Sequence, residues 1–233
     1  MEDPTYILYQ NEKMILNKFE AVIFDMDGVL IDSEPLWKIA LENVFQGLGS
    51  HLTKKDFQKT VGLRIDEVIS FWLEHEQWEN VTVESVWEMI LTQMLQLLES
   101  EGKPMIGVLD TIQYLKENHI KIGLATSSYR VLMHKVLAVL KIEDAFDVVH
   151  SAEHEPYGKP HPAVYLTVAN KLEVSPLKCL VVEDSINGVI AGKAARMHVV
   201  CIPEKTHEPN PKLMLADQTF EDMQEWLDYL KAN

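Results

Sequence analysis

Apolar positions along the chain follow two alternating patterns. Short apolar runs, rich in β-branched residues, predict buried strands at residues 21–24, 120–125, 147–150, 179–182 and 199–202. Between these runs, apolar residues recur every three or four positions, which predicts helices around residues 109–115, 132–140, 164–172 and 186–195. Strands that alternate with helices of about 10–15 residues indicate βαβ units and a parallel sheet.

The alternation is interrupted once, after the first strand, by a block that shows only helical spacing. Its apolar stripes begin at Trp37, Ile65 and Val83, its candidate helix caps are Thr53 and Thr82, and glycines at 47, 49 and 102 mark helix ends. We therefore expect an α/β fold with a Rossmann-like parallel sheet core formed by residues 19–35 and 103–233. A small all-helical cap of residues 36–102 is inserted after the first strand, and residues 1–18 form an N-terminal extension.

Composition limits the class of protein. The chain has 233 residues, of which 47% are hydrophobic, enough for a substantial core. The net charge of −15 disfavours a nucleic-acid partner, which requires a basic surface. The two cysteines, Cys179 and Cys201, lie in predicted strands and are expected to be packing residues. No apolar run reaches the ~18 residues of a membrane span, and residues 1–18 do not resemble a signal peptide. A monomer in the cytoplasm, with no membrane or nucleic-acid partner, is expected.

Polar residues that can take part in catalysis or ligand binding follow the predicted strands. Asp25 and Asp27 end the first strand, Thr126 and Ser127 end the second, and Glu183-Asp184 follows the strand at 179–182; Lys159 lies in the loop before the helix at 164–172. In parallel α/β sheets, ligands bind at the carboxyl ends of the strands. The sequence therefore brings acids, a hydroxyl and a lysine to one edge, a set suited to a phosphate beside a divalent cation.

Each member of this set also has a simpler interpretation on its own. Asp25 and Asp27 either flank a cation, or one of them holds a proton, because neighbouring carboxylates raise each other's pKa. Thr126 alone is a candidate helix cap, Lys159 alone a surface lysine, and Glu183-Asp184 alone a helix-initiating pair. A zinc site at His150, His154 and His161 is the other metal alternative, but hard oxygen ligands favour magnesium.

With these motifs in this order, the chain resembles the haloacid dehalogenase superfamily of phosphohydrolases, in the subfamily with an inserted helical cap. The resemblance covers residues 20 to about 220 and rests on Asp25-x-Asp27-Gly28, Thr126, Lys159 and Glu183-Asp184. The runs most similar to those of the 2-deoxyglucose-6-phosphate and hexitol-phosphate phosphatases are Ile31-Asp32-Ser33-Glu34-Pro35-Leu36-Trp37, Val61-Gly62-Leu63-Arg64-Ile65-Asp66, Gly158-Lys159-Pro160-His161-Pro162-Ala163-Val164-Tyr165 and Glu183-Asp184-Ser185-Ile186-Asn187-Gly188.

The resemblance implies a mechanism and a set of roles. Asp25 attacks phosphorus and forms an aspartyl-phosphate, while Asp27 protonates the leaving group and then activates water. Mg²⁺ is held by Asp25, the Asp27 carbonyl and Asp184. Glu183 joins this metal set or instead orients Lys159 or a metal-bound water. Thr126 and Lys159, assisted by Ser127, bind phosphate oxygens.

Substrate choice is assigned to the cap, where Arg64 is expected to contact a small phosphorylated sugar or polyol. Two alternatives stay open. The first is a β-phosphoglucomutase, which shares the motifs but carries His where this chain has Trp37. The second is a binding module of this fold without catalysis, which intact Asp25 and Asp27 disfavour.

Overall fold

The fold is centred on one parallel sheet, seen in a computed structural model that describes residues 18–57, 60, 65–76, 78, 80–203 and 210–233. Six strands lie in the order β3-β2-β1-β4-β5-β6 and all pair in parallel. They are β1 (Ala21–Phe24), β2 (Lys121–Thr126), β3 (Val148–Ser151), β4 (Cys179–Glu183), β5 (His198–Cys201) and β6 (Gln218–Thr219). Residues 1–17 of the predicted N-terminal extension lie outside the described residues.

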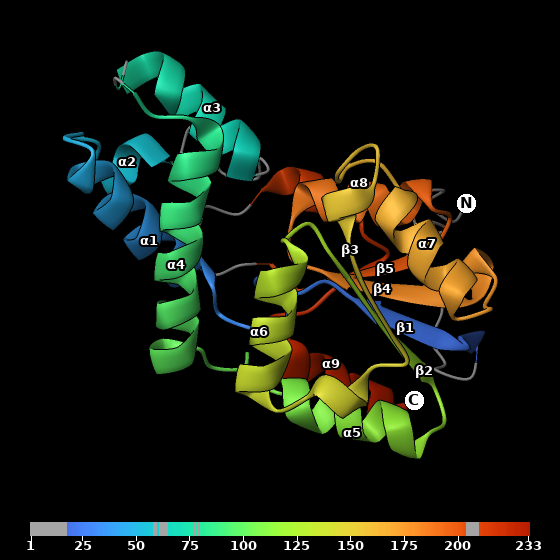
Figure 1. The fold of residues 1–233 in the computed structure, drawn as a ribbon. Coiled ribbons are helices and arrows are strands. Elements are labelled where there is room, and N and C mark those ends of the chain that lie inside the picture. Colours follow the sequence, from blue (N-terminus) through green and yellow to red (C-terminus); the bar gives the residue numbers. More distant parts are fainter. Residues whose placement is uncertain (1–17, 58–59, 61–64, 77, 79, 204–209) are drawn as a thin grey trace, which may run out of the picture.

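Helices cover both faces of this sheet (Figure 1). The helices of the α/β part are α5 (Val108–Glu117), α6 (Arg130–Leu140), α7 (Ala163–Lys171), α8 (Ile186–Ala194) and α9 (Met223–Ala232). One apolar core lies between the sheet and α5, α6 and α9 and continues into buried residues of the segment 36–98, and the other lies between the sheet and α7 and α8. Val22 and Phe24 face the first core, whereas Ala21 and Ile23 face the second, as the two-residue period of a strand requires.

The central position of β1 sets the place of the site. Phe24 pairs with Leu124 of β2 on one side and with Val182 of β4 on the other. The residues that follow these three strands therefore meet at one sheet edge. The chain builds β2 and β3 on one side of β1 and β4 to β6 on the other, so this edge is also the topological switch point, where ligands bind in open α/β sheets.

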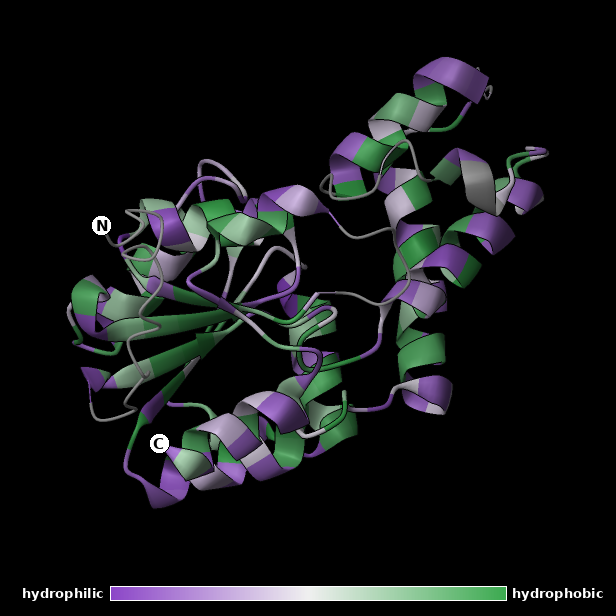
Figure 2. Ribbon diagram, turned by 180° about the vertical axis from the view of Figure 1, so that it is seen from behind, coloured by the Kyte–Doolittle hydropathy of each residue, from purple (hydrophilic) through white to green (hydrophobic). Residues whose placement is uncertain are grey.

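Four further helices form a group beside the sheet, α1 (Glu34–Gly47), α2 (Lys54–Phe57), α3 (Ile65–Glu76) and α4 (Val83–Glu101). Figures 1 and 2 show this helical group set apart from the α/β part, with α4 running beside α6. Thr82 caps α4 by accepting from the Ser85 amide, as predicted. Helix α1 begins at Glu34, two residues before the predicted start of the cap, because Pro35 fits the first turn of a helix.

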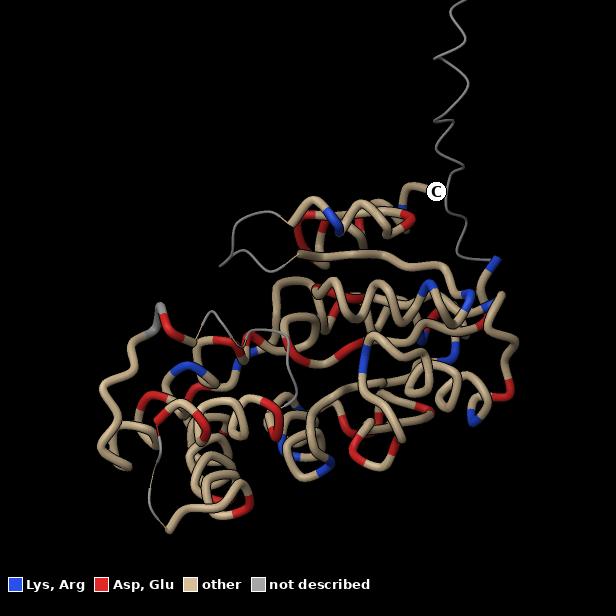
Figure 3. Tube along the Cα trace, turned by 90° about the horizontal axis from the view of Figure 1, so that it is seen from above, with Lys and Arg blue, Asp and Glu red and all other residues tan. Residues whose placement is uncertain are grey.

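The C-terminal segment holds two elements that the sequence patterns did not predict. Strand β6 has only two residues, and α9 follows with an apolar stripe of Met223, Trp226, Leu227 and Leu230. Asp and Glu are spread over the whole trace (Figure 3), consistent with the net charge of −15. Among the helices of the described residues, none is long and apolar enough to cross a membrane.

Candidate active site

Asp25 lies where the sequence places it, directly after β1. Its side chain is largely buried, and its Oδ1 accepts a hydrogen bond from Lys159 Nζ at 2.5 Å. Gly28 turns the chain back at a φ of 74°, a backbone conformation that suits glycine. A carboxylate at the end of a buried strand, paired with one ammonium group, is thus fixed at the centre of the edge.

Lys159 links three strand ends through one ammonium group. Nζ donates to Asp25 Oδ1, to Glu183 Oε1 at 2.6 Å and to the Ala125 carbonyl at 3.1 Å. Its side chain is only 6% exposed, so the alternative of a surface lysine is wrong. The loop before α7 therefore delivers a positive charge to the ends of β1, β2 and β4.

Glu183 is fully buried at the end of β4, and both of its oxygens accept several hydrogen bonds. Oε1 accepts from Lys159 and from the Tyr165 hydroxyl at 2.5 Å. Oε2 accepts from the Asp184 amide at 3.1 Å, the Ser185 amide at 3.2 Å and the Ser185 hydroxyl at 3.1 Å. Helix α8 begins at Ile186 with Ser185 as its cap, so the interpretation of Glu183-Asp184 as a helix-initiating pair is wrong.

These contacts shift the pKa of each buried group. Burial raises the pKa of Asp25 to about 7, and the negative charges of Glu183 and Asp27 add to the effect of burial against the opposing charge of Lys159. The pKa of Asp25 in this protein environment therefore lies well above the value of about 4 that is usual for a carboxyl group. Burial opposes the charge of Glu183 as well, but the charge of Lys159 and the hydrogen bonds from Lys159, Tyr165 and Ser185 together outweigh it and lower the Glu183 pKa. Tyr165, whose pKa burial raises well above its usual value, stays a proton donor.

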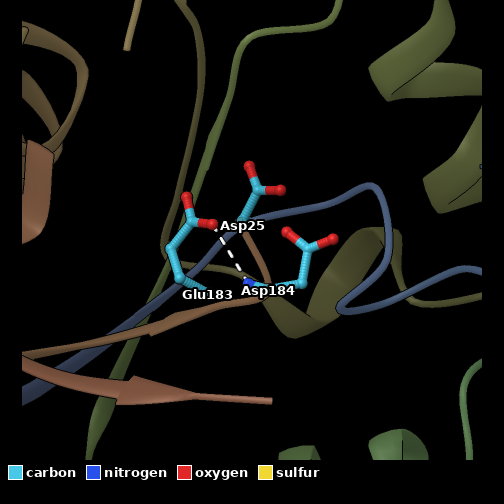
Figure 4. Close-up of side chains that lie close together, drawn as sticks. All are labelled: Asp25, Glu183 and Asp184. Carbon is cyan, nitrogen blue, oxygen red and sulfur yellow. Dashed lines mark hydrogen bonds between the residues drawn. The ribbon is translucent and has the colours of Figure 1, made fainter. Parts of the chain in front are cut away.

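Asp184 completes a group of three carboxylates. Asp25, Glu183 and Asp184 each offer an oxygen within 4.8 Å of the others, and Figure 4 shows them around one space. A Cβ built on Gly28 would lie 2.1 Å from Asp184 Oδ2, so glycine is needed for this approach. Hard carboxylate oxygens suit Mg²⁺. The donors already on Glu183 leave Asp25 and Asp184 as the better-placed ligands.

Asp27 points its carboxylate at a different set of partners. Oδ1 accepts from the Ser33 hydroxyl at 2.5 Å and the Trp37 indole N–H at 3.4 Å, and Oδ2 accepts from the Ser128 hydroxyl at 2.7 Å. These donors come from the turn before α1, from α1 itself and from the loop after β2. Asp27 is therefore held between the α/β part and the helical group.

The loop after β2 contains Thr126, Ser127 and Ser128. Thr126 is buried, and its hydroxyl accepts from the Ser128 amide at 3.0 Å. The cap position of α6 is Tyr129, so the interpretation of Thr126 as that helix cap is wrong. Ser127 is exposed at the site edge. Ser128 instead contacts Asp27, which brings this loop and the first strand's end together.

Two further predictions concern Arg64 and the histidines. Arg64 lies outside the described residues. Within the described part of the chain, the three-carboxylate group is the one cluster of three or more His, Cys, Asp or Glu side chains with converging ligand atoms. His150 instead contacts Glu155 at 2.8 Å, so the zinc alternative gains no support from this geometry.

Sequence reasoning missed the hydroxyl groups that hold the acids. Ser33, Ser128 and Tyr165 each donate to an active-site carboxylate. Ser33 and Tyr165 stand in the runs that carry the family resemblance, which was the one available signal. A hydroxyl near a motif can donate to any of several nearby acceptors, and the spacing along the sequence does not determine which one it contacts.

Known proteins are similar to this chain in sequence and in fold. The family model described as haloacid dehalogenase-like hydrolase matches residues 22–202. Hexitol phosphatase B of Escherichia coli (strain K12) is 42% identical over 199 residues, which cover 84% of this chain and 89% of that protein. The phosphorylated carbohydrates phosphatase of Thermotoga maritima is 34% identical over 176 residues, 76% of this chain and 81% of that protein.

The solved structure of CbbY from Rhodobacter sphaeroides in complex with phosphate superposes with a TM-score of 0.81 at 23% identity, covering 91% of this chain and 99% of that one, which supports the fold. The predicted α/β fold with a Rossmann-like sheet is confirmed. The chain therefore belongs to the haloacid dehalogenase-like hydrolases, and the prediction of a hydrolytic enzyme is confirmed.

Proposed function

We propose that the protein hydrolyses the phosphate monoester of a small sugar or polyol, of the 2-deoxyglucose 6-phosphate or hexitol phosphate type, through an aspartyl-phosphate on Asp25. The observation that carries the proposal is the hydrogen bond from Lys159 Nζ to Asp25 Oδ1 at 2.5 Å, with a carboxylate oxygen of Asp184 within 4.8 Å of one of Asp25. One carboxylate, one ammonium and one further acid at a strand end suit attack on a phosphate ester. The names of the two phosphatase relatives support the substrate class.

In the first half-reaction, an Asp25 oxygen forms a bond to phosphorus while the bond to the sugar oxygen breaks. Asp27 gives its proton to that leaving oxygen. In the second, water attacks the phosphorus of the aspartyl-phosphate, Asp27 takes a proton from the water, and the bond to Asp25 breaks. Hydrogen bonds from Ser33, Trp37 and Ser128 fix the orientation of the Asp27 carboxyl group for both transfers.

Asp25, Asp184 and the Asp27 backbone carbonyl are the groups proposed to hold Mg²⁺. When bound, the ion screens the repulsion between carboxylates and a phosphate dianion. Glu183 is assigned to Lys159 rather than to the ion, because five donors already occupy its oxygens. This assignment replaces the direct metal role that the resemblance left open for Glu183.

Phosphate oxygens are proposed to contact Lys159, Thr126 and Ser127. Lys159 is held at the ends of β1, β2 and β4, and Thr126 and Ser127 end β2 or follow it. The helical group is proposed to act as the cap, with residues 36–102 closing over a core of residues 19–35 and 103–233. Arg64 is proposed to contact the sugar hydroxyls from that cap.

The test is Mg²⁺-dependent release of inorganic phosphate from a panel of sugar and polyol phosphates. We expect turnover of 2-deoxyglucose 6-phosphate or a hexitol 6-phosphate, loss of activity in EDTA, recovery with Mg²⁺ and none with Ca²⁺. β-Glucose 1-phosphate with the 1,6-bisphosphate is assayed in parallel. Formation of glucose 6-phosphate without phosphate release would show that the protein is a mutase. No reaction with any ester would favour the alternative of a binding module without catalysis.

A further inference from the structure

The hydroxyl of Tyr165 is a buried group with no role in the chemistry above. Tyr165 lies in α7, is fully buried and donates to Glu183 Oε1 at 2.5 Å. The same oxygen accepts from Lys159 Nζ at 2.6 Å. The hydroxyl and the ammonium thus share one carboxylate oxygen.

The Tyr165 ring also contacts the lysine. Lys159 Nζ lies 4.8 Å from the ring centroid, within the range of a cation–π interaction. The Tyr165 side chain therefore contacts both the Glu183 carboxylate and the Lys159 ammonium of a buried ion pair. Its ring stabilises the ammonium, and its hydroxyl stabilises the carboxylate.

Glu183 cannot adjust freely if the hydroxyl is lost. Its other oxygen is held by the amides of Asp184 and Ser185. A Cβ built on Gly188 would lie 1.7 Å from Oε1, so α8 packs directly against the carboxyl group. A buried carboxylate that loses a donor is under-solvated, and the remaining mobile donor on Oε1 is Lys159.

We propose that Tyr165 is a positioning residue, which balances Glu183 so that the Lys159 ammonium stays shared with Asp25 and available to phosphate oxygens. The proposal rests on the proposed function, because it needs Lys159 to contact phosphate. Without the hydroxyl, Glu183 draws Lys159 toward itself and away from Asp25. The loss then falls on the transition state, where charge on the phosphate oxygens is greatest.

Tyr165→Phe tests this, since it keeps the ring and removes only the hydroxyl. Tyr114→Phe is the matched control, because the Tyr114 hydroxyl donates to the Leu230 carbonyl at 3.4 Å, between α5 and α9. We expect kcat on 2-deoxyglucose 6-phosphate to fall about tenfold in Tyr165→Phe, with KM within about twofold. The inhibition constant of orthovanadate, a transition-state mimic, should rise by the same factor. The Mg²⁺ concentration for half-maximal activity should stay unchanged, as should every constant of Tyr114→Phe.

A double-mutant cycle with Glu183→Gln asks whether Tyr165 acts through Glu183. In the wild-type background the hydroxyl faces a charged carboxylate, whereas in the Glu183→Gln background it faces a neutral amide. We therefore expect Tyr165→Phe to lower kcat by less than about twofold in the Glu183→Gln background. Equal losses in both backgrounds would overturn the proposal.

The remaining outcomes also decide the matter. Unchanged kcat and orthovanadate inhibition with a lowered melting temperature would show a purely structural hydroxyl. A raised KM or Mg²⁺ requirement with unchanged kcat would contradict the proposal as well. These results leave the proposed function intact, whereas a wild-type protein that neither hydrolyses phosphate esters nor binds orthovanadate removes both.

Discussion

The indole N–H of Trp37, in α1 of the helical group, donates to Oδ1 of Asp27 across 3.4 Å. Asp27 belongs to the turn that follows the central strand, so this bond joins the two parts of the molecule at the proposed acid–base group. The Ser33 hydroxyl shares the same oxygen at 2.5 Å. The position of the helical group therefore bears directly on the surroundings of Asp27.

Trp37→Phe removes this donor while keeping an aromatic side chain. We expect kcat on 2-deoxyglucose 6-phosphate to fall about threefold, because a long, single hydrogen bond contributes less than about 1 kcal/mol. Turnover of p-nitrophenyl phosphate, whose leaving group needs no proton, should change less. Trp78→Phe is the control, since Trp78 packs against Phe45 within the helical group, with 5.0 Å between the two ring centroids. An unchanged kcat on both substrates, or the same loss in Trp78→Phe, would contradict a role of Trp37 through Asp27.

Asp27→Asn separates the two half-reactions. The amide cannot take up or release the proton, so we expect a loss of about 10²–10⁴-fold on a sugar phosphate. With p-nitrophenyl phosphate, attack by Asp25 still proceeds, and the phosphoenzyme accumulates because water is no longer activated. Acid-quench mass spectrometry measures the added phosphoryl group. Equal losses on both esters without accumulation would contradict the acid–base assignment.

Asp25→Asn should reduce turnover below about 1% of wild type, because an amide is a far weaker nucleophile than a carboxylate. The variant keeps the shape of the side chain, so the protein should remain folded. Asp32→Asn serves as the control, since Asp32 is close in sequence but exposed. Phosphate release from 2-deoxyglucose 6-phosphate is the measurement, and substantial activity in Asp25→Asn would remove its role as nucleophile.

The sheet and the site edge were predictable because buried parallel strands are continuous apolar runs with fixed ends. Residues 179–182 form such a run, and the whole of β4 (Cys179–Glu183) is buried. The partners of Asp27 were not predictable, because Ser128 lies 101 positions away and its hydroxyl rotates to suit its surroundings. The effect of burial on the pKa of Asp25 was not predictable for a related reason, since burial depends on the whole fold. Strand β6 is too short and polar to show a pattern.

Gly28→Ala should weaken Mg²⁺ binding. Gly28 has a φ of 74°, and an added Cβ would lie 2.1 Å from Asp184 Oδ2, so Asp184 has to move. Gly49→Ala is a matched control, because Gly49 has a φ of 85° with no heavy atom within 4 Å of a built Cβ. Both variants should lose about 1 kcal/mol of stability from the left-handed backbone. Only Gly28→Ala should raise the Mg²⁺ concentration for half-maximal activity, by about tenfold or more. An equal requirement in both variants would place Asp184 outside the metal site.

Asp217 makes stability depend on pH, at a place away from the proposed site. Burial disfavours its charge, but hydrogen bonds from Lys193 at 2.6 and 2.7 Å and from the Val199 amide at 2.8 Å outweigh it and lower its pKa. A pKa lower in the folded than in the unfolded protein means that the unfolded chain binds more protons in this range. The stabilisation is therefore present above the unfolded value of about 3.9 and lost as the pH falls through the folded value.

Asp217→Asn tests this linkage, because the amide keeps an acceptor for Val199 but loses the charge that faces Lys193. We expect the variant to melt about 2–4 °C below wild type at pH 7, the equivalent of about 1 kcal/mol for a chain of this size. The two melting temperatures should converge as the pH falls below about 4. Glu221→Gln, at an exposed position, controls for the loss of one surface carboxylate. A constant difference between Asp217→Asn and wild type from pH 7 to pH 3, measured by thermal unfolding, would show that the charge of Asp217 contributes nothing.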